Sequence, residues 1–443
     1  MNNVKSYFNK NKYEGSILVL IAIIIEIFFY LSESGFSVMS YVGAVIILFS
    51  GLMLTLEKST YLFFILVANQ RLLVILDNDI SLINILIITI IFKQIQTNVI
   101  KFSISTILII VGFVAYSIIP SFVGSNYSNI ILFVRVLALF IMLFNIRKYK
   151  NDKKEIYSRV LLYFSLGCIV MGVLGILFDP NFVLGTSYRF MGSALNNPND
   201  FSMMLIFSVS VLSVYYNINH NHRLEIFFIV LGLVFFGLLT QSRTFIFGLI
   251  IIIFWYLLFT NKQLKFRKKN IGTSFIILLL IVVLVSISDF RIVFEVALDR
   301  IINPRQGDIT GSRFELWGQY YDFLVNNPKY LFFGIGMNLD ILKQVGINYV
   351  AHNFLIEHIV NWGIVGLVIS FILFRHYLTL FLGKQISRFK LSLALSYVPL
   401  LTLVVLSLTR HAPLNISFVT NFFIGVMVIK LYYERDKNKL PQQ

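Results

Sequence analysis

Three arginines, Arg189, Arg243 and Arg410, stand close to the ends of long apolar runs. The guanidinium group is a planar, permanently charged fork of N–H donors whose shape matches the oxygens of a phosphate. A cluster of arginines at a membrane edge therefore suits a lipid phosphate or diphosphate, although each one alone could be a surface residue that reaches solvent. Arg243 is the strongest candidate, because its short loop between two apolar runs contains no acidic residue.

A second polar group surrounds His352, where a long hydrophilic stretch gives way to an apolar run. The pattern predicts a helix that begins at or just after His352, and a helix N-terminus attracts anions. A histidine there could act as a general base or a phosphate partner, because imidazole titrates near physiological pH. Asn353, Glu357 and Asn361 should form a polar stripe on that helix. Glu357 is either functional or the structural partner of an arginine on another helix.

Two further segments have less specific patterns. Residues 192–200, which end in Asn-Pro-Asn-Asp before an apolar run, predict an ordinary outer turn with a helix N-cap. Residues 331–336, Leu-Phe-Phe-Gly-Ile-Gly, contain glycines that could let the backbone approach a ligand or could simply turn the chain. Neither segment alone indicates a particular chemistry.

Metal and nucleotide chemistry have little support in the sequence. The one cysteine, Cys168, lies in an apolar run, so a cysteine-based metal site is excluded. Asp77 and Asp79 have a spacing that can hold a divalent cation, but a solvated loop explains them better. The glycine-rich loop of nucleotide-hydrolysing enzymes is also missing. We therefore predict neither a metal nor a cofactor.

The elements that must position these residues are strongly apolar. Hydrophobic residues make up 58% of the 443 positions and charged residues only 13%, against about 25% in soluble proteins. A transmembrane helix needs about 20 apolar residues, so we predict an all-α polytopic membrane protein with about 12 to 14 transmembrane helices. This composition excludes most soluble enzymes, disordered proteins and nucleic-acid binders, despite the formal net charge of +16.

Hydropathy predicts the positions of the spans and the division of the chain. The candidate spans are 16–32, 36–56, 60–76, 80–92, 103–119, 129–146, 157–178, 201–219, 224–240, 243–260, 271–288, 353–374, 391–409 and 412–432. Residues 1–288 should hold about 11 helices, 352–432 about three, and 433–443 a cytoplasmic tail. Residues 289–351, which include Arg313, should form an extracytoplasmic cap.

The distribution of basic residues predicts the orientation, because loops rich in Lys and Arg stay in the cytoplasm. With 14 spans, most of the 37 Lys and Arg residues fall on the cytoplasmic side, which also holds both termini. Arg189, Arg243 and His352 then face outside. Topology and attraction to anionic lipid explain the basic surplus, so no nucleic-acid partner is predicted.

The predicted cap has helical signals of its own. Ser312 and Glu315 have the spacing of a capping box, which opens a run through Trp317 and Tyr320 that ends before Pro328. A loop of this length within a compact membrane protein is usually functional. We therefore expect the cap to cover a cavity on the outer face.

The order of these motifs resembles that of the O-antigen ligase and Wzy-type polysaccharide polymerase superfamily. The motifs are Tyr188-Arg189 with Gly192 and Asn197-Pro198-Asn199; Ser242-Arg243-Thr244; Ser312-Arg313-Phe314 with Trp317; Asn327-Pro328 with Phe333-Gly334-Ile335-Gly336; and Ala351-His352-Asn353 with Gly363 and Gly366. Each motif is weak alone. Their shared order over roughly residues 185–375, with the cap just before the His-Asn helix, carries the resemblance.

The resemblance implies a membrane glycosyltransferase of the GT-C type in the bacterial cytoplasmic membrane, without a metal. Its substrate would be an oligosaccharide on undecaprenyl diphosphate, as donor and acceptor, with flippase and chain-length regulator proteins as candidate partners. Arg189 and Arg243 match arginines that bind the diphosphate, and His352 matches an essential histidine. Substrate contacts are also expected from Arg313, Glu357, Asn353, Arg410 and Tyr188.

Three functions remain open at this point. We favour a polymerase of capsular, exopolysaccharide or O-antigen repeat units, because the matches are looser than in typical ligases and the cap is modest. A ligase would transfer the glycan to another acceptor, such as a lipid A core, wall or protein. A lipid-linked oligosaccharide flippase or other transporter would need a charged cavity at mid-membrane and related halves, whereas here the polar residues gather at one membrane face.

Overall fold

The computed structural model describes most of the chain. The described residues are 2–70, 72–73, 81–100, 104–124, 128–150, 152–179, 182, 189–192, 197–219, 223–263, 292, 295–296, 311–336, 338–349, 351–383, 391–407 and 416–437. Their regular elements are all helices, and none of these residues forms a strand. The predicted all-α fold class is therefore confirmed.

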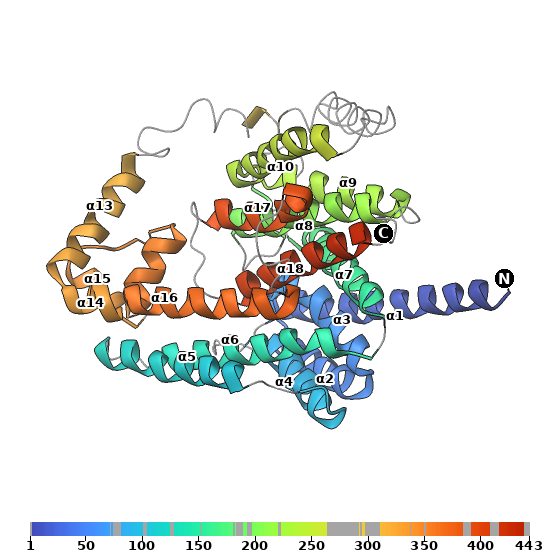
Figure 1. Ribbon diagram of the computed structural model, residues 1–443, viewed down its shortest axis with the longest axis horizontal. Helices are drawn as coiled ribbons and strands as arrows, with labels where there is room; N and C mark the ends of the chain where they lie inside the picture. Colours follow the sequence, from blue (N-terminus) through green and yellow to red (C-terminus); the bar gives the residue numbers. More distant parts are fainter. Residues whose placement is uncertain are drawn as a thin grey trace. The chain divides into compact units, whose positions relative to one another are not determined.

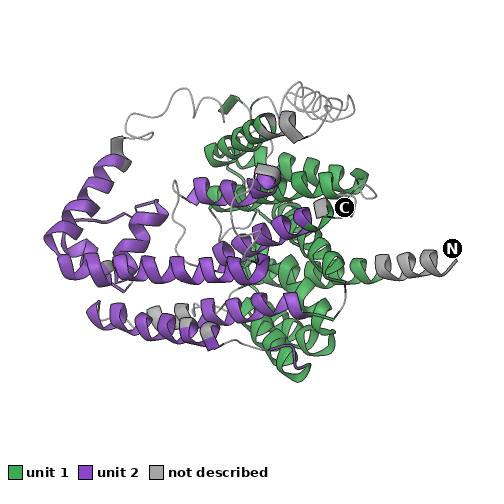
Figure 2. Ribbon diagram, in the orientation of Figure 1, with its two compact units in different colours: residues 1–97, 149–298, 434–443 green, residues 98–148, 299–433 purple. Residues whose placement is uncertain are grey.

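The chain forms two compact units (Figure 2). Unit 1 comprises residues 1–97, 149–298 and 434–443, and unit 2 comprises residues 98–148 and 299–433. Both units thus join segments that are distant in the sequence. The predicted division into membrane helices, cap and tail follows the membrane topology instead, and it stays a prediction.

Unit 1 is built from eight described α-helices (Figure 1). They are α1 (Asn2–Glu33), α2 (Val38–Met53), α3 (Leu56–Leu66), α4 (Ile83–Gln96), α7 (Lys153–Phe178), α8 (Pro198–Ile218), α9 (Arg223–Leu239) and α10 (Arg243–Gln263). Helix α8 packs against α7, α9 and α10, and every residue from Phe201 to Leu212 is buried. The predicted N-cap is present: Asn197 accepts a 2.9 Å hydrogen bond from the backbone N–H of Asn199, with Pro198 at the first helical position.

Unit 2 contains the helices that carry the second polar group. They are α5 (Ile104–Val123), α6 (Ser128–Asn145), α13 (Gly311–Asn326), α14 (Pro328–Phe333), α15 (Leu339–Gln344), α16 (Phe354–Leu382), α17 (Val398–Ser407) and α18 (Ile416–Lys437). Helix α16 packs against α5 and α14. Helix α13 ends at Asn326 as predicted, but it begins at Gly311, so Ser312 lies within its first turn instead of before it.

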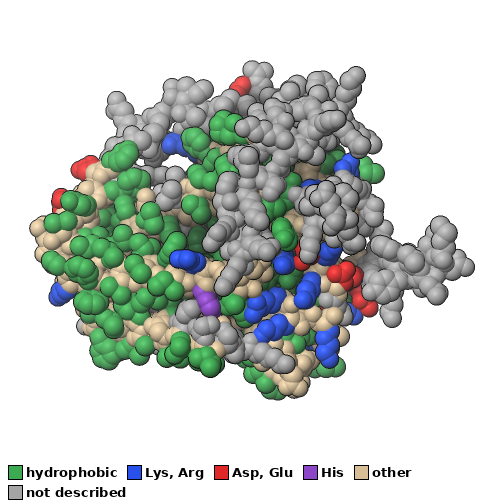
Figure 3. All heavy atoms as spheres, in the orientation of Figure 1, with side chains coloured by type: hydrophobic (Ala, Val, Ile, Leu, Met, Phe, Trp, Pro, Cys, Tyr) green, Lys and Arg blue, Asp and Glu red, His purple; other side chains and the backbone are tan. Residues whose placement is uncertain are grey.

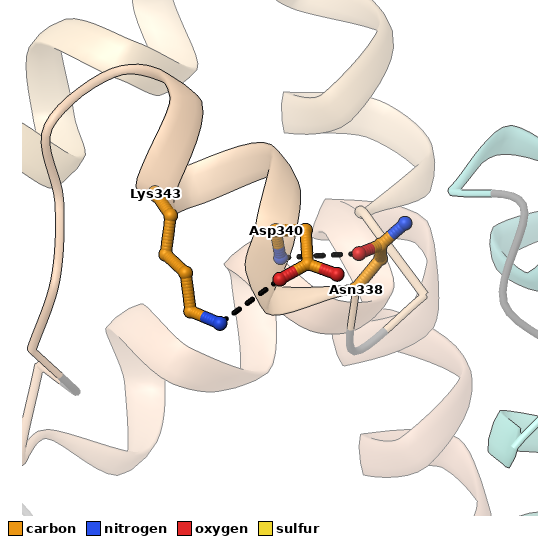
Figure 4. Close-up of polar contacts among 3 residues, drawn as sticks. All are labelled: Asn338, Asp340 and Lys343. Carbon is orange, nitrogen blue, oxygen red and sulfur yellow. Dashed lines mark hydrogen bonds and ion pairs between the residues drawn. The ribbon is translucent and has the colours of Figure 1, made fainter.

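The three helices α13, α14 and α15 form a packed cap on the start of α16. Their shared hydrophobic core consists of Tyr320, Phe323, Leu324, Ile335, Leu342, Ile347, Ala351 and Val360. Asn338 opens α15 by accepting a 3.1 Å hydrogen bond from the N–H of Asp340, and Lys343 pairs with Asp340 at 2.9 Å (Figure 4). The Asn338 amide also donates to the carbonyl of Gly124 at the end of α5, at 2.6 Å. The cap is thus tied to a second helix of unit 2.

Six described helices are long and apolar enough to cross a membrane. These segments are Glu14–Glu33, Thr106–Val123, Lys153–Phe178, Pro198–Ile218, Phe354–Leu382 and Ile416–Arg435. Four shorter apolar helices accompany them, and the predicted span 271–288 lies outside the described residues. Large hydrophobic side chains such as Phe49, Leu108 and Phe254 are exposed on these helices, and Figure 3 shows many hydrophobic side chains on one face. The chain is a multi-pass membrane protein.

Candidate functional site

The first part of the candidate site connects Arg189 to the start of α10. Arg189 donates a 2.8 Å hydrogen bond from Nη2 to Oδ1 of Asn199, in the first turn of α8. The same oxygen accepts a 2.7 Å hydrogen bond from the hydroxyl of Ser242, the residue before Arg243. Ser202 donates to Ser242 at 3.0 Å. One amide oxygen therefore links the segment of Arg189 to the helix that Arg243 begins.

Arg243 occupies an unusual place for a cation. It is the first residue of α10, where the positive end of the helix dipole disfavours a positive side chain and favours an anion. The turn before it, Thr240 to Ser242, is polar yet buried, and Gln241 adopts a left-handed φ of 47°. A bound anion would be stabilised by both the guanidinium and the helix N-terminus. This local arrangement suits a phosphate group.

Residues 189–192, although not helical, are tightly held within unit 1. The Phe190 side chain is fully buried against Phe201 and Phe236, and its N–H donates to the carbonyl of Leu239 at 3.2 Å. Gly192 has a φ of 74°, which only glycine adopts readily. Packing thus fixes the backbone that carries Arg189.

The second part of the candidate site is the turn at His352 in unit 2. His352 has a left-handed φ of 51°, and Asn353 caps α16 by accepting hydrogen bonds from the N–H groups of Leu355 and Ile356, at 3.0 and 3.2 Å. The Glu357 carboxylate, 4% exposed, accepts a 2.8 Å hydrogen bond from the N–H of His352. The helix start is as predicted, and Glu357 stabilises the turn from inside the helix.

The cap contacts the same turn from its other side. Trp317 donates from its indole N–H to the carbonyl of Ala351 at 2.7 Å, and the Tyr320 hydroxyl donates to the carbonyl of Tyr349 at 2.8 Å. Burial, together with the smaller effect of the nearby Glu357 charge, raises the pKa of Tyr320 to about 12. The Tyr320 hydroxyl therefore stays protonated and able to donate at physiological pH.

Helix α16 is interrupted at Gly363, whose φ of 70° and ψ of 174° are not helical. The carbonyls released by this break are satisfied by distant partners. Those of Val360 and Asn361 accept from the N–H groups of Ile335 and Gly336, at 2.8 and 3.1 Å.

The third released carbonyl, that of Trp362, accepts from the Tyr116 hydroxyl at 2.5 Å. Such satisfaction is what makes a break tolerable in a membrane helix. The Phe-Gly-Ile-Gly segment, considered above as a ligand loop or a turn, bonds to this break and does turn the chain, with φ values of 79° at Gly334 and 63° at Gly336.

The structure brings together only some of the predicted site residues. Arg189 and Arg243 lie near one another in unit 1, and His352, Asn353 and Glu357 lie together in unit 2. The convergence of the two groups stays a prediction. The side chain of Arg313 and the whole of Arg410 and Tyr188 fall outside the described part of the chain.

Several residues that shape the site were not predicted to do so. Asn199 was expected only in a turn, and Trp317 only in a helical run, yet each supports a candidate residue. The role of Trp317 could have been predicted from its residue type, because a half-buried Trp needs an acceptor for its N–H. Metal chemistry gains no candidate: the described residues contain no group of three or more His, Cys, Asp or Glu that could hold an ion.

One protein family matches the part of the chain that holds the His352 turn and the start of α10. Residues 226–371 match the family model described as O-Antigen ligase, which includes Arg243, Arg313 and His352 but not Arg189. No curated protein matches the chain. The matched region runs from α9 through the cap to α16. It contains the motifs described above from Ser242-Arg243-Thr244 to Gly363 and Gly366. The match supports the resemblance to the O-antigen ligase and Wzy-type superfamily over residues 226–371 and, with it, glycan transfer in general.

Proposed function

We propose that the protein polymerises oligosaccharide repeat units, carried on undecaprenyl diphosphate, into capsular, exopolysaccharide or O-antigen chains. The supporting observation is the Arg189–Asn199–Ser242 network, which brings one arginine to the helix start that carries another. Two guanidinium groups beside a helix N-terminus suit the two phosphates of a lipid diphosphate. The predicted topology places this site on the outer face of the cytoplasmic membrane.

The proposed reaction is an inverting displacement at the anomeric carbon of the donor sugar. The hydroxyl oxygen of the acceptor sugar forms a bond to that carbon while the bond from carbon to diphosphate oxygen breaks. The diphosphate leaves with the electron pair, and Arg189 and Arg243 stabilise its growing charge without reorganising. The hydroxyl proton passes to His352 or to the departing diphosphate.

Positive charge from arginine can replace a divalent cation in this step. The guanidinium is permanently charged and holds phosphate oxygens in a fixed geometry. We therefore propose metal-independent transfer. Chain growth should continue in excess EDTA, and a strict requirement for added Mg²⁺ or Mn²⁺ would contradict the proposal.

The role of His352 follows from how its turn is built. Hydrogen bonds from Trp317 to Ala351 and from His352 to Glu357 fix the backbone on both sides of the imidazole. A group held in this way can position or deprotonate an acceptor hydroxyl with little loss of freedom on binding. Asn353 and Glu357, which lie at the same helix start, and Arg313 are proposed to bind substrate.

Ligase activity is the second candidate, because the matching family model carries that description. The same site would then transfer the glycan to a different acceptor. Purified protein in liposomes with lipid-diphosphate repeat units distinguishes the candidates. A ladder of chain lengths supports a polymerase, transfer only to another acceptor supports a ligase, and translocation without new glycosidic bonds would support a flippase.

The variant His352→Ala gives the matching test in cells. The protein should still insert into the membrane, but chain growth should stop and single lipid-linked repeats should accumulate. Normal long chains from this variant would contradict the role proposed for His352.

A further inference from the structure

Unit 1 buries a polar group that the proposed reaction does not use. Glu26 and Tyr30 of α1 and Asn69, just after α3, are 0%, 3% and 0% exposed. Asn69 donates from Nδ2 to Oε2 of Glu26 at 3.2 Å, and its side chain lies close enough to the Tyr30 hydroxyl to interact with it. Glu26 Oε1 and Asn69 Oδ1 have no hydrogen-bond partner among the described residues. Three apolar side chains at these positions would avoid the free-energy cost of burying polar atoms. The polar side chains are therefore expected to have a function.

Tyr30 extends this group to the segment that carries Arg189. Its hydroxyl donates a hydrogen bond to the carbonyl of Gly192, which is 162 positions away in the sequence. Its ring stacks on Phe178 at the end of α7, with 5.4 Å between ring centroids. A methyl group at Gly175 would come within 2.3 Å of the Gly192 carbonyl oxygen, so α7 approaches the segment too closely for any larger residue.

The 189–192 segment is held at one end by Asn199 and at the other end by Tyr30. Residues 189–192 have no regular secondary structure, so their hydrogen bonds must come from neighbouring elements. Asn199 holds the Arg189 guanidinium, Leu239 accepts from the N–H of Phe190, and Tyr30 holds the far end at Gly192. A charged group stabilises a transition state best when it is fixed before the reaction.

We infer that Tyr30 is a positioning residue for Arg189, and that Asn69 and Glu26 orient its hydroxyl. The Tyr30 hydroxyl acts through the Gly192 carbonyl and not through contact with substrate. Its kinetic consequence rests on the proposed function, whereas its effect on the 189–192 segment does not. The two consequences are therefore measured separately.

The first experiment measures the segment without any reaction. A nitroxide label on Met191→Cys, in a Cys168→Ser background of the full-length protein in liposomes, reports backbone motion by electron paramagnetic resonance. Tyr30→Phe keeps the ring stacked on Phe178 but removes the hydroxyl, and it should give a more mobile label. An unchanged spectrum would overturn the inference, whether or not the protein is a polymerase.

Tyr149→Phe is the matched control in the same unit. The Tyr149 hydroxyl is also buried, but it bonds to Thr60 of α3 at 2.9 Å and Gln94 of α4 at 3.1 Å instead of to the 189–192 segment. This variant should lose similar thermal stability without changing the label at position 191. Equal loosening by both variants would mean that Tyr30 has only a general structural role.

The second experiment measures glycan transfer by the unlabelled variants. Tyr30→Phe should lower kcat on the order of tenfold, with little change in KM, because the loss falls mainly on a contact of the transition state. Asn69→Leu should have the same effect, and the double variant should be no worse than either single variant.

Additive losses, or wild-type kinetics for Tyr30→Phe, would contradict the inference. An inactive wild-type protein would refute the proposed function alone, because the label experiment still decides the role of Tyr30.

Discussion

The guanidinium of Arg189 and the side-chain oxygen of Asn199 are joined by a hydrogen bond of 2.8 Å, which ties a non-helical segment to the first turn of α8. The same oxygen accepts from Ser242 at 2.7 Å. Asn199 therefore sets the distance between the segment of Arg189 and the start of α10. It holds the site together without carrying a charge itself.

Replacing Asn199 with Ala should lower the rate of glycan transfer on the order of tenfold to a hundredfold, because both tethers are lost and Arg189 is misplaced. The protein should still insert and purify as a folded species. Asn217→Ala, near the other end of the same helix, removes a 2.9 Å bond to the Ser213 carbonyl and a 3.2 Å bond to the Tyr256 hydroxyl, and it should leave activity intact. Equal activity in the two variants would count against the role of Asn199.

Trp317→Phe should remove one of the two side-chain hydrogen bonds from the cap to the backbone at residues 349–351, while keeping an aromatic ring beside Phe314. The lost hydrogen bond to Ala351 costs about 1 kcal/mol of folding free energy, and a looser turn should reduce turnover more than it reduces stability. Tyr321→Phe is the control, because Tyr321 lies on the same helix and is 67% exposed. Turnover by Trp317→Phe at the control level would rule out this positioning role.

Gly363→Ala should be strongly destabilising. The φ of 70° strains any larger residue, and the added methyl would lie 2.1 Å from the carbonyl oxygen of Phe332. Gly318→Ala offers the contrast, because nothing lies within 4 Å and it is a helical position, where Ala is favoured by about 1 kcal/mol. Thermal unfolding in detergent should show a large drop for the first variant and none for the second. Similar melting of both proteins would mean that the break in α16 is not maintained by Gly363.

The hydroxyl of Tyr320 should make the cap sensitive to alkali. Burial raises its pKa from 10.0 to about 12, so the unfolded chain loses this proton first. The resulting stability is fully present below pH 10 and is lost as the pH rises toward 12. Unfolding of the cap, followed by the fluorescence of Trp317, should depend more steeply on pH in this range for wild type than for Tyr320→Phe. Parallel curves would show that Tyr320 is not shielded in the folded state.

Much of this architecture is predictable from local patterns. Apolar runs predict the membrane helices, and the short polar side chains of Asn197 and Asn353 mark two helix starts, because each can accept from the backbone of its own first turn. The end of α13 before Pro328 follows from the same kind of rule.

Other features depend on partners that are distant in the sequence. The apolar run around Gly363 has no interruption, so hydropathy cannot show a break that depends on Ile335 and Tyr116. Tyr30 bonds to Gly192 across 162 positions, and no spacing rule connects them. The arginines and the histidine, by contrast, stand out in the sequence because charge is rare near these apolar runs.

The proposed reaction depends most on Arg189 and Arg243, which are proposed to hold the departing diphosphate. The direct measurement is the rate of chain growth by Arg243→Ala in liposomes that contain lipid-diphosphate repeat units, with wild type and Arg243→Lys beside it. Loss of the guanidinium should slow transfer on the order of a hundredfold or more, and Lys should restore only part of the rate because it lacks the planar fork. A normal ladder of chain lengths from a folded, correctly inserted Arg243→Ala protein would contradict the account.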